Sequence, residues 1–105
     1  MTVKTNFDTY QDCWLQIERY FMDSSPAIII HNKDGVVARI TTCIPGGGAD
    51  ETHSFIDTNN CSWAEDFIEK YKLGQYTGMK EISGYCEYPL YEFDMEMLKK
   101  YAKQD

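Results

Sequence analysis

A hairpin pattern in residues 27–44, "AIIIHNKDGVVARITTCI", restricts the fold more than any other feature of the chain. Two runs rich in β-branched residues flank Asn32-Lys33-Asp34-Gly35, and the Asp-Gly step supplies the positive φ that tight hairpin turns require. We therefore expect two antiparallel strands here, within a sheet built mainly from the N-terminal half of the chain.

Residues 45–51, "PGGGADE", interrupt regular structure, because proline followed by glycines carries a high backbone-entropy cost inside a strand or helix. A glycine-rich loop can hold a phosphate group, but this one lacks the G-x-x-x-x-G-K-[ST] pattern and contains no lysine. Asp50 and Glu51 would also repel an anion. We interpret the segment as a flexible connector.

Residues 62–73 have the clearest helical pattern. Ser62 and Glu65 have the spacing of a capping box, in which side chains accept backbone N–H groups at the helix start. Gly74 follows the pattern as a left-handed stop. The apolar residues recur at the spacing of one helix face: Trp63, Ala64, Phe67, Ile68 and Tyr71. We predict a helix over 62–73, with Trp63 and Phe67 anchored in the core.

The polar residues just before that helix allow two interpretations. Asp57, Asn59 and Asn60 are typical of a turn between a strand and a helix, because their short side chains bond to nearby backbone groups. Alternatively, His53, Asp57 and Cys61 would form a metal site or a Cys–His catalytic pair. A nucleophilic cysteine needs a base within reach, and "HSFIDT" is typical of a strand that enters a turn. We therefore favour the turn.

Residues 8–22, "DTYQDCWLQIERYFM", fit two periodicities. Their apolar positions match helical spacing, and Asp8 with Gln11 resembles a capping box. Cys13, Leu15 and Ile17 also alternate as they would in a strand. Periodicity alone slightly favours the helix.

The C-terminal part contains a predicted loop, strand and helix. Residues 74–84, "GQYTGMKEISG", are rich in glycine and are predicted to be a loop. The next segment, "YCEYPLYEF" (85–93), favours a strand, but Pro89 lacks an N–H and indicates an edge strand or a bulge. Asp94 is expected to cap a short helix, "MEMLKKYAK" (95–103), whose lysines suit its C-terminal end: Lys99, Lys100 and Lys103.

Acidic residues outnumber basic ones by 17 to 10, and the formal net charge is −7. Proteins that grip phosphate backbones cluster lysine and arginine, so we expect no direct binding to nucleic acid. No apolar run approaches the roughly 20 residues of a membrane span, and the N-terminus lacks a secretory pattern. A cytoplasmic protein is expected. The four cysteines form no C-x-x-C pair, which favours free thiols, and we expect no metal and no cofactor.

Residues 55–93 resemble a family of small, functionally undefined domains encoded on conjugative and phage-derived elements of gut Firmicutes. The resemblance rests on motifs in the same order: Asp57-Thr58-Asn59-Asn60, Trp63-Ala64-Glu65, Thr77-Gly78, Ser83-Gly84-Tyr85 and Tyr88-Pro89-Leu90-Tyr91-Glu92-Phe93. Two positions depart from the pattern. Ser62 stands where proline is common, and Met79 replaces a basic residue, which argues against an anion contact there. The looser match of the front half implies that 11–21 is a strand, with the helix as the alternative.

Small acidic proteins of such elements include type II-A anti-CRISPR proteins, which inhibit Cas9. The resemblance implies a non-enzymatic protein that binds Cas9, or its complex with guide RNA, at a basic surface. It would block guide RNA or target DNA by competition, and the positively charged channels of Cas9 suit an acidic partner. The alternative is an accessory or regulatory protein-binding module of the mobile element itself.

The expected contact surface is the segment 85–96, where aromatic anchors alternate with carboxylates. Its residues are Tyr85, Glu87, Tyr88, Tyr91, Glu92, Asp94 and Glu96. The same tyrosines are also suited to pack on helix 62–73, with the acids as a solvated rim. The chain is expected to form a single α+β domain over 1–105. In it, an antiparallel sheet carries the main helix 62–73 on one face, beside a short C-terminal helix.

Overall fold

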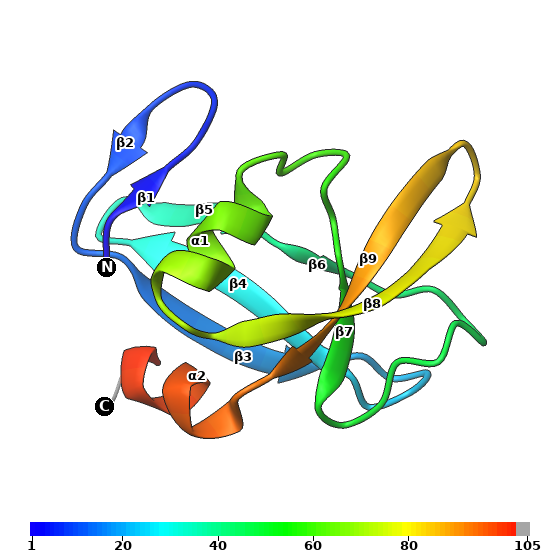
Figure 1. Ribbon diagram of the computed structural model, residues 1–105. Helices are drawn as coiled ribbons and strands as arrows, with labels where there is room; N and C mark the ends of the chain where they lie inside the picture. Colours follow the sequence, from blue (N-terminus) through cyan, green and yellow to red (C-terminus); the bar gives the residue numbers. More distant parts are fainter. Residues whose placement is uncertain (103–105) are drawn as a thin grey trace.

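Three antiparallel sheets and two short helices make up residues 1–102, the part of the chain that the computed structural model describes (Figure 1). The first sheet pairs β1 (Val3–Lys4) with β2 (Thr9–Tyr10), and the second has the order β3 (Trp14–Arg19), β4 (Pro26–Asn32), β5 (Gly35–Arg39). The third has the order β6 (Thr41–Thr42), β7 (His53–Ile56), β9 (Cys86–Phe93), β8 (Gly74–Ser83). The helices are α1 (Ala64–Lys70) and α2 (Met95–Tyr101). The α+β class is confirmed, but strands dominate, and several sheets replace the single one expected under a main helix.

The predicted hairpin forms between β4 and β5, which pair from Asn32 and Gly35 at the turn. Its second run does not continue as one strand, because β6 leaves β4 and pairs with β7 in the third sheet. Buried Ile40 links the two sheets. Its N–H donates to the Ile28 carbonyl at 3.1 Å, and its carbonyl accepts the N–H of Asp57 at 2.9 Å.

Residues 14–19 form a strand, as the resemblance implied, and the helical spacing of 8–22 gave a wrong indication. β3 pairs with β4 along its whole length, from Trp14 opposite His31 to Arg19 opposite Pro26. The strand prevails because β4 offers β3 a complete set of hydrogen-bonding partners. Local apolar spacing carries no information about such a neighbour.

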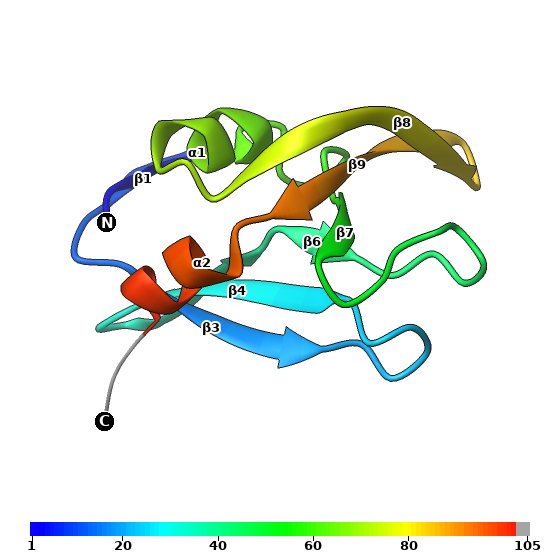
Figure 2. The same cartoon turned by 60° about the horizontal axis from the view of Figure 1, so that its bottom comes forward.

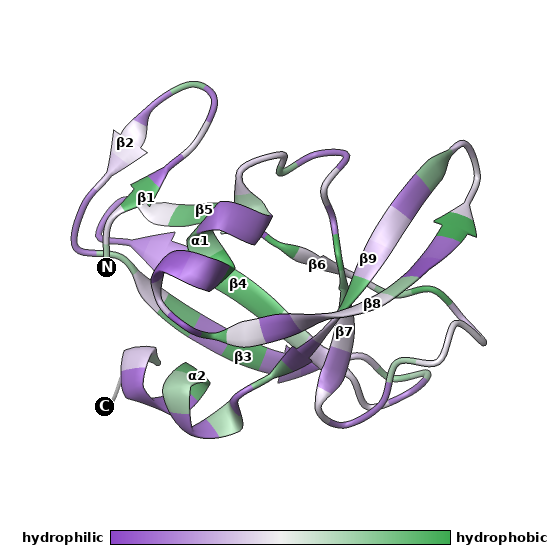
Figure 3. Cartoon of the chain, viewed as in Figure 1, coloured by the Kyte–Doolittle hydropathy of each residue, from purple (hydrophilic) through white to green (hydrophobic). Residues whose placement is uncertain are grey.

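The main core lies between the β3–β4–β5 sheet and a layer that contains α1 and the β8–β9 hairpin (Figure 2). Figure 3 shows β4 as a largely hydrophobic strand through the middle of the molecule. Its Ile28 and Ile30 are fully buried, and they belong to one cluster with residues from both helices and β9: Phe67, Ile68, Tyr91, Phe93 and Leu98. A smaller cluster of Ile44, Phe55 and Leu90 lies on the other face of β9, because side chains alternate along a strand.

α1 starts later than predicted and without a capping box. Its N-cap residue, Trp63, makes no side-chain hydrogen bond to the helix start. Ser62 Oγ instead accepts a hydrogen bond from Asn6 Nδ2 at 2.7 Å, and Glu65 accepts one from Tyr91. Both predicted capping side chains are therefore bound to residues distant in the sequence.

Aromatic rings line the buried side of α1. Phe67 is buried, as predicted, whereas Trp63 is half-buried at the edge of the core. Their rings meet edge to face with centroids 6.1 Å apart, and Phe67 in turn contacts Tyr71 at 5.3 Å. The row ends at Tyr101 of α2, 5.4 Å from Tyr71, so it joins the two helices.

The end of α1 is set by Lys72 rather than by Gly74. Lys72 has a left-handed φ of 55°, and the N–H groups of Lys72 and Leu73 bond back to carbonyls of α1 at 3.2 and 2.9 Å. These two bonds form the Schellman motif, in which the residue with the left-handed φ is usually a glycine. Gly74 instead starts β8, where a Cβ atom would lie 2.6 Å from the Glu92 carbonyl oxygen. Glycine is needed there for the close approach of two strands.

The loop predicted for 74–84 is wrong, because most of these residues form β8. β8 pairs with β9 along its length, apart from a bulge between Tyr76 and Lys80. Gly78 takes a φ of +87° within the bulge, and Thr77 Oγ1 donates to the Leu90 carbonyl at 2.8 Å. Gly78 and Gly84, which suggested a loop, therefore serve a bulge and a turn inside a hairpin.

β9 is not an edge strand, since it lies between β7 and β8, but the bulge that Pro89 also indicated is present: the β8–β9 register shifts next to the pair of Lys80 and Pro89. Pro89 is tolerated because β7 stops short of it, at the pair formed by Phe55 and Leu90. From that point the hairpin continues beyond β7 and projects from the molecule (Figure 1). We call residues 77–89 the distal hairpin.

α2 follows β9 directly, and Asp94 caps it as predicted. Asp94 Oδ1 accepts the N–H groups of Glu96 and Met97 at 3.1 and 3.2 Å. Beyond the helix, Ala102 forms a parallel bridge with Leu15 of β3. Lys103, the last residue of the predicted helix, lies outside the described residues. Neither helix of residues 1–102 is long and apolar enough to cross a membrane.

Candidate functional site

The polar residues before α1 form a turn. Asp57 accepts two hydrogen bonds from Asn60, one at Oδ1 from the N–H (3.2 Å) and one at Oδ2 from the side-chain amide (2.9 Å). The Asp57 carbonyl also accepts the N–H of Cys61 at 2.8 Å. The turn prediction is confirmed for Asp57 and Asn60, and Asn59 lies exposed between them.

The alternative metal or Cys–His site is not assembled. Cys61 is 5% exposed, and its Sγ donates to the Arg39 carbonyl at 3.5 Å. Burial raises the pKa of the Cys61 thiol to about 11, whereas the nucleophilic form of cysteine is the thiolate. His53 contacts two other carboxylates instead. Its Nδ1 lies 2.7 Å from Asp50 Oδ1, and its Nε2 lies 3.2 Å from Glu92 Oε2. Within residues 1–102, no three His, Cys, Asp or Glu side chains are arranged to hold a metal ion.

The residues predicted to contact a partner do not form one surface. Tyr85 is fully exposed at the turn of the distal hairpin, Glu87 is exposed beside it, and Tyr88 is half-buried. Tyr91 is only 1% exposed. Its hydroxyl donates to Glu65 Oε2 at 2.6 Å. Tyr91 therefore belongs to the core and is inaccessible to a partner in this conformation.

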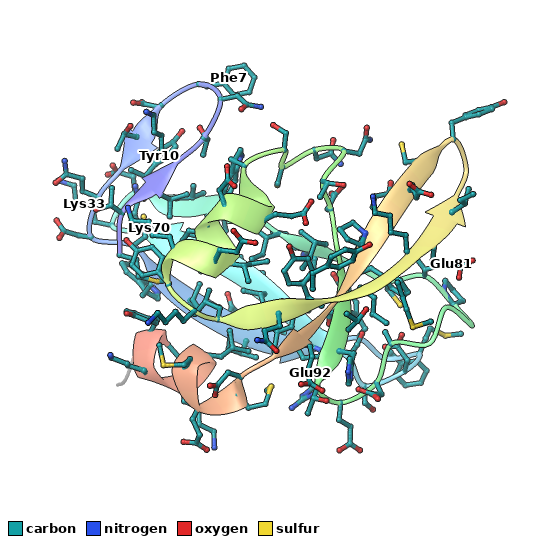
Figure 4. The ribbon with its side chains drawn as sticks, in the orientation of Figure 1. Phe7, Tyr10, Lys33, Lys70, Glu81 and Glu92 are labelled. Atoms are coloured by element: carbon teal, nitrogen blue, oxygen red, sulfur yellow. The ribbon has the colours of Figure 1, made fainter. Side chains whose placement is uncertain are left out.

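The remaining predicted contacts lie at the other end of β9 and on α2. Glu92 pairs with His53, and the Asp94 carboxylate accepts hydrogen bonds from the α2 backbone. Glu96 is exposed, 3.7 Å from Lys99. In Figure 4 Glu92 lies well away from Glu81, which marks the distal hairpin. The predicted segment thus divides between two separate regions.

Exposed apolar side chains on β8 were missed by sequence reasoning. Met79 and Ile82 are 64 and 67% exposed, and Tyr76 is partly exposed nearer the core. A loop prediction gives no reason to ask which side chains are presented together. One usable signal is that 74–83 is long enough to pair with 86–93 across a short turn at Gly84 and Tyr85.

The charged groups of the distal hairpin are unequally paired. Lys80 Nζ lies 3.7 Å from Glu87 Oε1 on the neighbouring strand. Glu81 is exposed and has no ion-pair partner among residues 1–102. The hairpin therefore combines apolar side chains, a neutralised ion pair and one available carboxylate.

An open cavity of about 570 Å³ lies where α1 ends and where β8 and α2 begin. It is lined by Glu69, Lys72, Gly74, Gln75, Glu92, Phe93 and Asp94. Two of its carboxylates already bind other groups, His53 and the start of α2. The lining contains no cysteine, serine or histidine, and its charged side chains are those of Glu69, Lys72, Glu92 and Asp94.

Comparison with known proteins identifies the family of the chain. No curated protein and no solved structure matches it. A family model, described as a domain of unknown function (DUF4313), matches residues 14–105. The matched range starts with β3 and includes both helices and the distal hairpin. The chain therefore belongs to the DUF4313 family.

Proposed function

We propose that this protein is a non-enzymatic protein-binding module whose contact surface is the distal hairpin. The observation that carries the proposal is the joint exposure of Met79, Ile82 and Tyr85 on one projecting hairpin. Figure 3 shows hydrophobic colour at the end of β8, next to the turn. Grouped exposed apolar side chains mark interaction sites, because removing their surface from water drives association.

Charge supports a basic surface as the partner. The chain carries a net charge of −7. The distal hairpin itself contributes Glu81 without an ion-pair partner among residues 1–102, while Glu87 balances Lys80. Opposite charges on two surfaces speed their encounter and select the correct partner.

The partner that we propose is Cas9 or its complex with guide RNA, as the resemblance of residues 55–93 implies. Cas9 holds its nucleic acids in a positively charged channel. An acidic module that places an apolar hairpin beside that channel competes with guide RNA or target DNA for the same basic surface. The support for this partner is the charge of the chain and its projecting hairpin.

DNA cleavage by Cas9 tests the proposal, with the protein added either before or after guide loading. Inhibition is expected in at least one order of addition. The triple variant Met79→Ser/Ile82→Ser/Tyr85→Ser is expected to lose inhibition and keep its melting temperature, because these residues lie outside both core clusters.

Phe7→Ser is the matched control, since Phe7 is 95% exposed but lies in the β1–β2 turn, away from the distal hairpin (Figure 4). Cleavage that is unchanged in both orders excludes Cas9 as the partner. Equal inhibition by the triple variant and the unmodified protein excludes the distal hairpin as the contact surface. A hairpin-dependent complex with a protein of the same mobile element, and none with Cas9, would favour the accessory-module alternative.

A further inference from the structure

We infer that an extended basic segment of a partner protein adds as a further strand to the outer edge of β8. The inference rests on the proposed function, because it states how the distal hairpin binds. The sheet order β6-β7-β9-β8 leaves the outer side of β8 without a neighbouring strand among residues 1–102. Such an edge presents unpaired N–H and C=O groups, and a polypeptide backbone is the ligand that matches them.

Pro89 reveals which backbone groups of β8 point outward. Lys80 lies opposite Pro89, and opposed residues of antiparallel strands exchange either two hydrogen bonds or none. Because Pro89 has no N–H, this pair is of the second kind. The N–H and C=O of Lys80 therefore point away from β9, and by alternation so do those of Ile82. β8 thus offers two donor–acceptor sets at the spacing of one added strand.

The devices that usually block an edge strand are weak between residues 80 and 83. Proteins protect edges with proline, lysine, bulges, very short strands or a covering element. The bulge lies before Lys80, and this segment contains no proline. α1 lies beside the start of β8 and not beside its distal part (Figures 1 and 2). The charge of Lys80 is balanced by Glu87, 3.7 Å away.

Side chains on β8 select an occupant with alternating basic and apolar residues. Glu81 points to the face opposite that of Lys80 and Ile82. A residue of the added strand opposite Glu81 has its Cβ about 4.5–5.5 Å from that of Glu81, within reach of a lysine or arginine ion pair. The residue opposite Ile82 meets an exposed apolar side chain. The net charge of −7 disfavours a second copy of this chain as the occupant.

Nuclear magnetic resonance of the ¹⁵N-labelled full chain tests strand addition, with a short synthetic peptide of alternating valine and lysine as the probe. Binding is expected to shift the amide resonances of residues 80–83. It should also slow hydrogen exchange at Lys80 and Ile82 by at least about tenfold, because both amides become hydrogen-bonded.

Several results would overturn the inference. The inference fails if millimolar peptide shifts no amide resonance, or if the shifts are centred outside β8. It also fails if the same peptide with N-methylated backbone amides binds equally well. The N-methylated peptide keeps its charge but cannot complete a ladder. Exchange that slows with protein concentration alone would identify a second copy as the occupant, which also contradicts a basic segment.

A pair of variants separates backbone pairing from side-chain contact. Ile82→Pro removes an outward N–H without removing a bond to β9, whereas Ile82→Thr keeps the N–H and loses the apolar side chain. Ile82→Pro is expected to abolish peptide binding and Ile82→Thr to retain most of it. If Ile82→Pro fails to fold, the N-methylated peptide decides the question.

The outcomes also distinguish this inference from the proposed function. Equal losses in the two variants overturn strand addition and leave the distal hairpin as a side-chain contact surface. Peptide pairing at Lys80 and Ile82 without any effect on Cas9 cleavage leaves strand addition standing and excludes Cas9 as the partner.

Discussion

The hydroxyl of Tyr91 donates a 2.6 Å hydrogen bond to Glu65 Oε2 and so joins the central strand β9 to α1. Burial of the phenol, together with this bond and the charge of Glu65, raises the pKa of Tyr91 above its usual value. Hydrogen bonds to charged groups contribute more than those between neutral groups. Glu65 therefore stabilises the packing of α1 on the sheet rather than the helix start.

Tyr91→Phe should lower the free energy of unfolding by about 1.5–3 kcal/mol, because it removes a hydrogen bond to a charged group. Urea denaturation measures the change. Tyr76→Phe is the control, since the Tyr76 ring lies 5.7 Å from that of Tyr91 but is 42% exposed. Equal stability losses in the two variants would show that the bond to Glu65 contributes nothing.

The free energy of unfolding should fall as the pH rises from about 9 to about 11, because the Cys61 thiol ionises more readily in the unfolded chain. Burial, followed by the charge of Asp57, raises the pKa of the Cys61 thiol from 9.0 to about 11. In this interval the unfolded chain releases a proton that the folded chain retains, which favours unfolding. Below the interval both states keep the proton, and the contribution to stability is complete. Cys61→Ala should remove this component, so an unchanged pH profile in the variant would refute the assignment.

The turn before α1 should be sensitive to Asp57 and Asn60 but not to Asn59. Asp57→Ala removes the acceptor of both bonds from Asn60 and should cost about 1 kcal/mol, as a lost cap does. Asn60→Ala removes the side-chain bond and should cost less. Asn59→Ala is the matched control, with no expected loss in a thermal melt. If all three variants melt at the same temperature, the turn bonds do not stabilise the fold.

Lys72→Gly should stabilise the protein by about 1 kcal/mol, because the left-handed conformation is unfavourable by about that amount for a residue with a Cβ atom. Lys72 is exposed, so its side chain gives up little packing. Lys70→Gly, at the last residue of α1, is the opposite control and should destabilise by up to about 1 kcal/mol. Melting temperatures that move in the same direction for both variants would contradict the role given to Lys72.

Features that depend on near neighbours in the sequence could be predicted, and features that depend on distant partners could not. The turn at Asp57 and Asn60 and the cap at Asp94 each involve residues only a few positions apart. Glu65 matched a local capping pattern, yet its partner Tyr91 lies 26 residues away. β8 has no buried residue and so shows no apolar alternation, and its strand conformation follows from pairing with β9.

The same limit explains the mixed outcome for the candidate contact residues. Tyr85 and Tyr91 belong to similar aromatic and acidic surroundings in the sequence, but one lies at a turn and the other under α1. The two tyrosines are distinguished only by the pairing register of β7, β9 and β8, which places Tyr91 between two strands and Tyr85 in the turn. Met79 and Ile82 were missed because their presentation requires the same register.

The β8–β9 hairpin combines two kinds of evolutionary constraint within one short piece of chain. At the base of this hairpin, Gly74 is constrained by the close approach of the Glu92 backbone and Tyr91 by the core, so substitutions there cost stability. Toward its turn, Met79 and Ile82 touch neither core cluster. Substitutions can therefore accumulate toward the turn of this hairpin without loss of stability, whereas selection for a stable fold preserves its base.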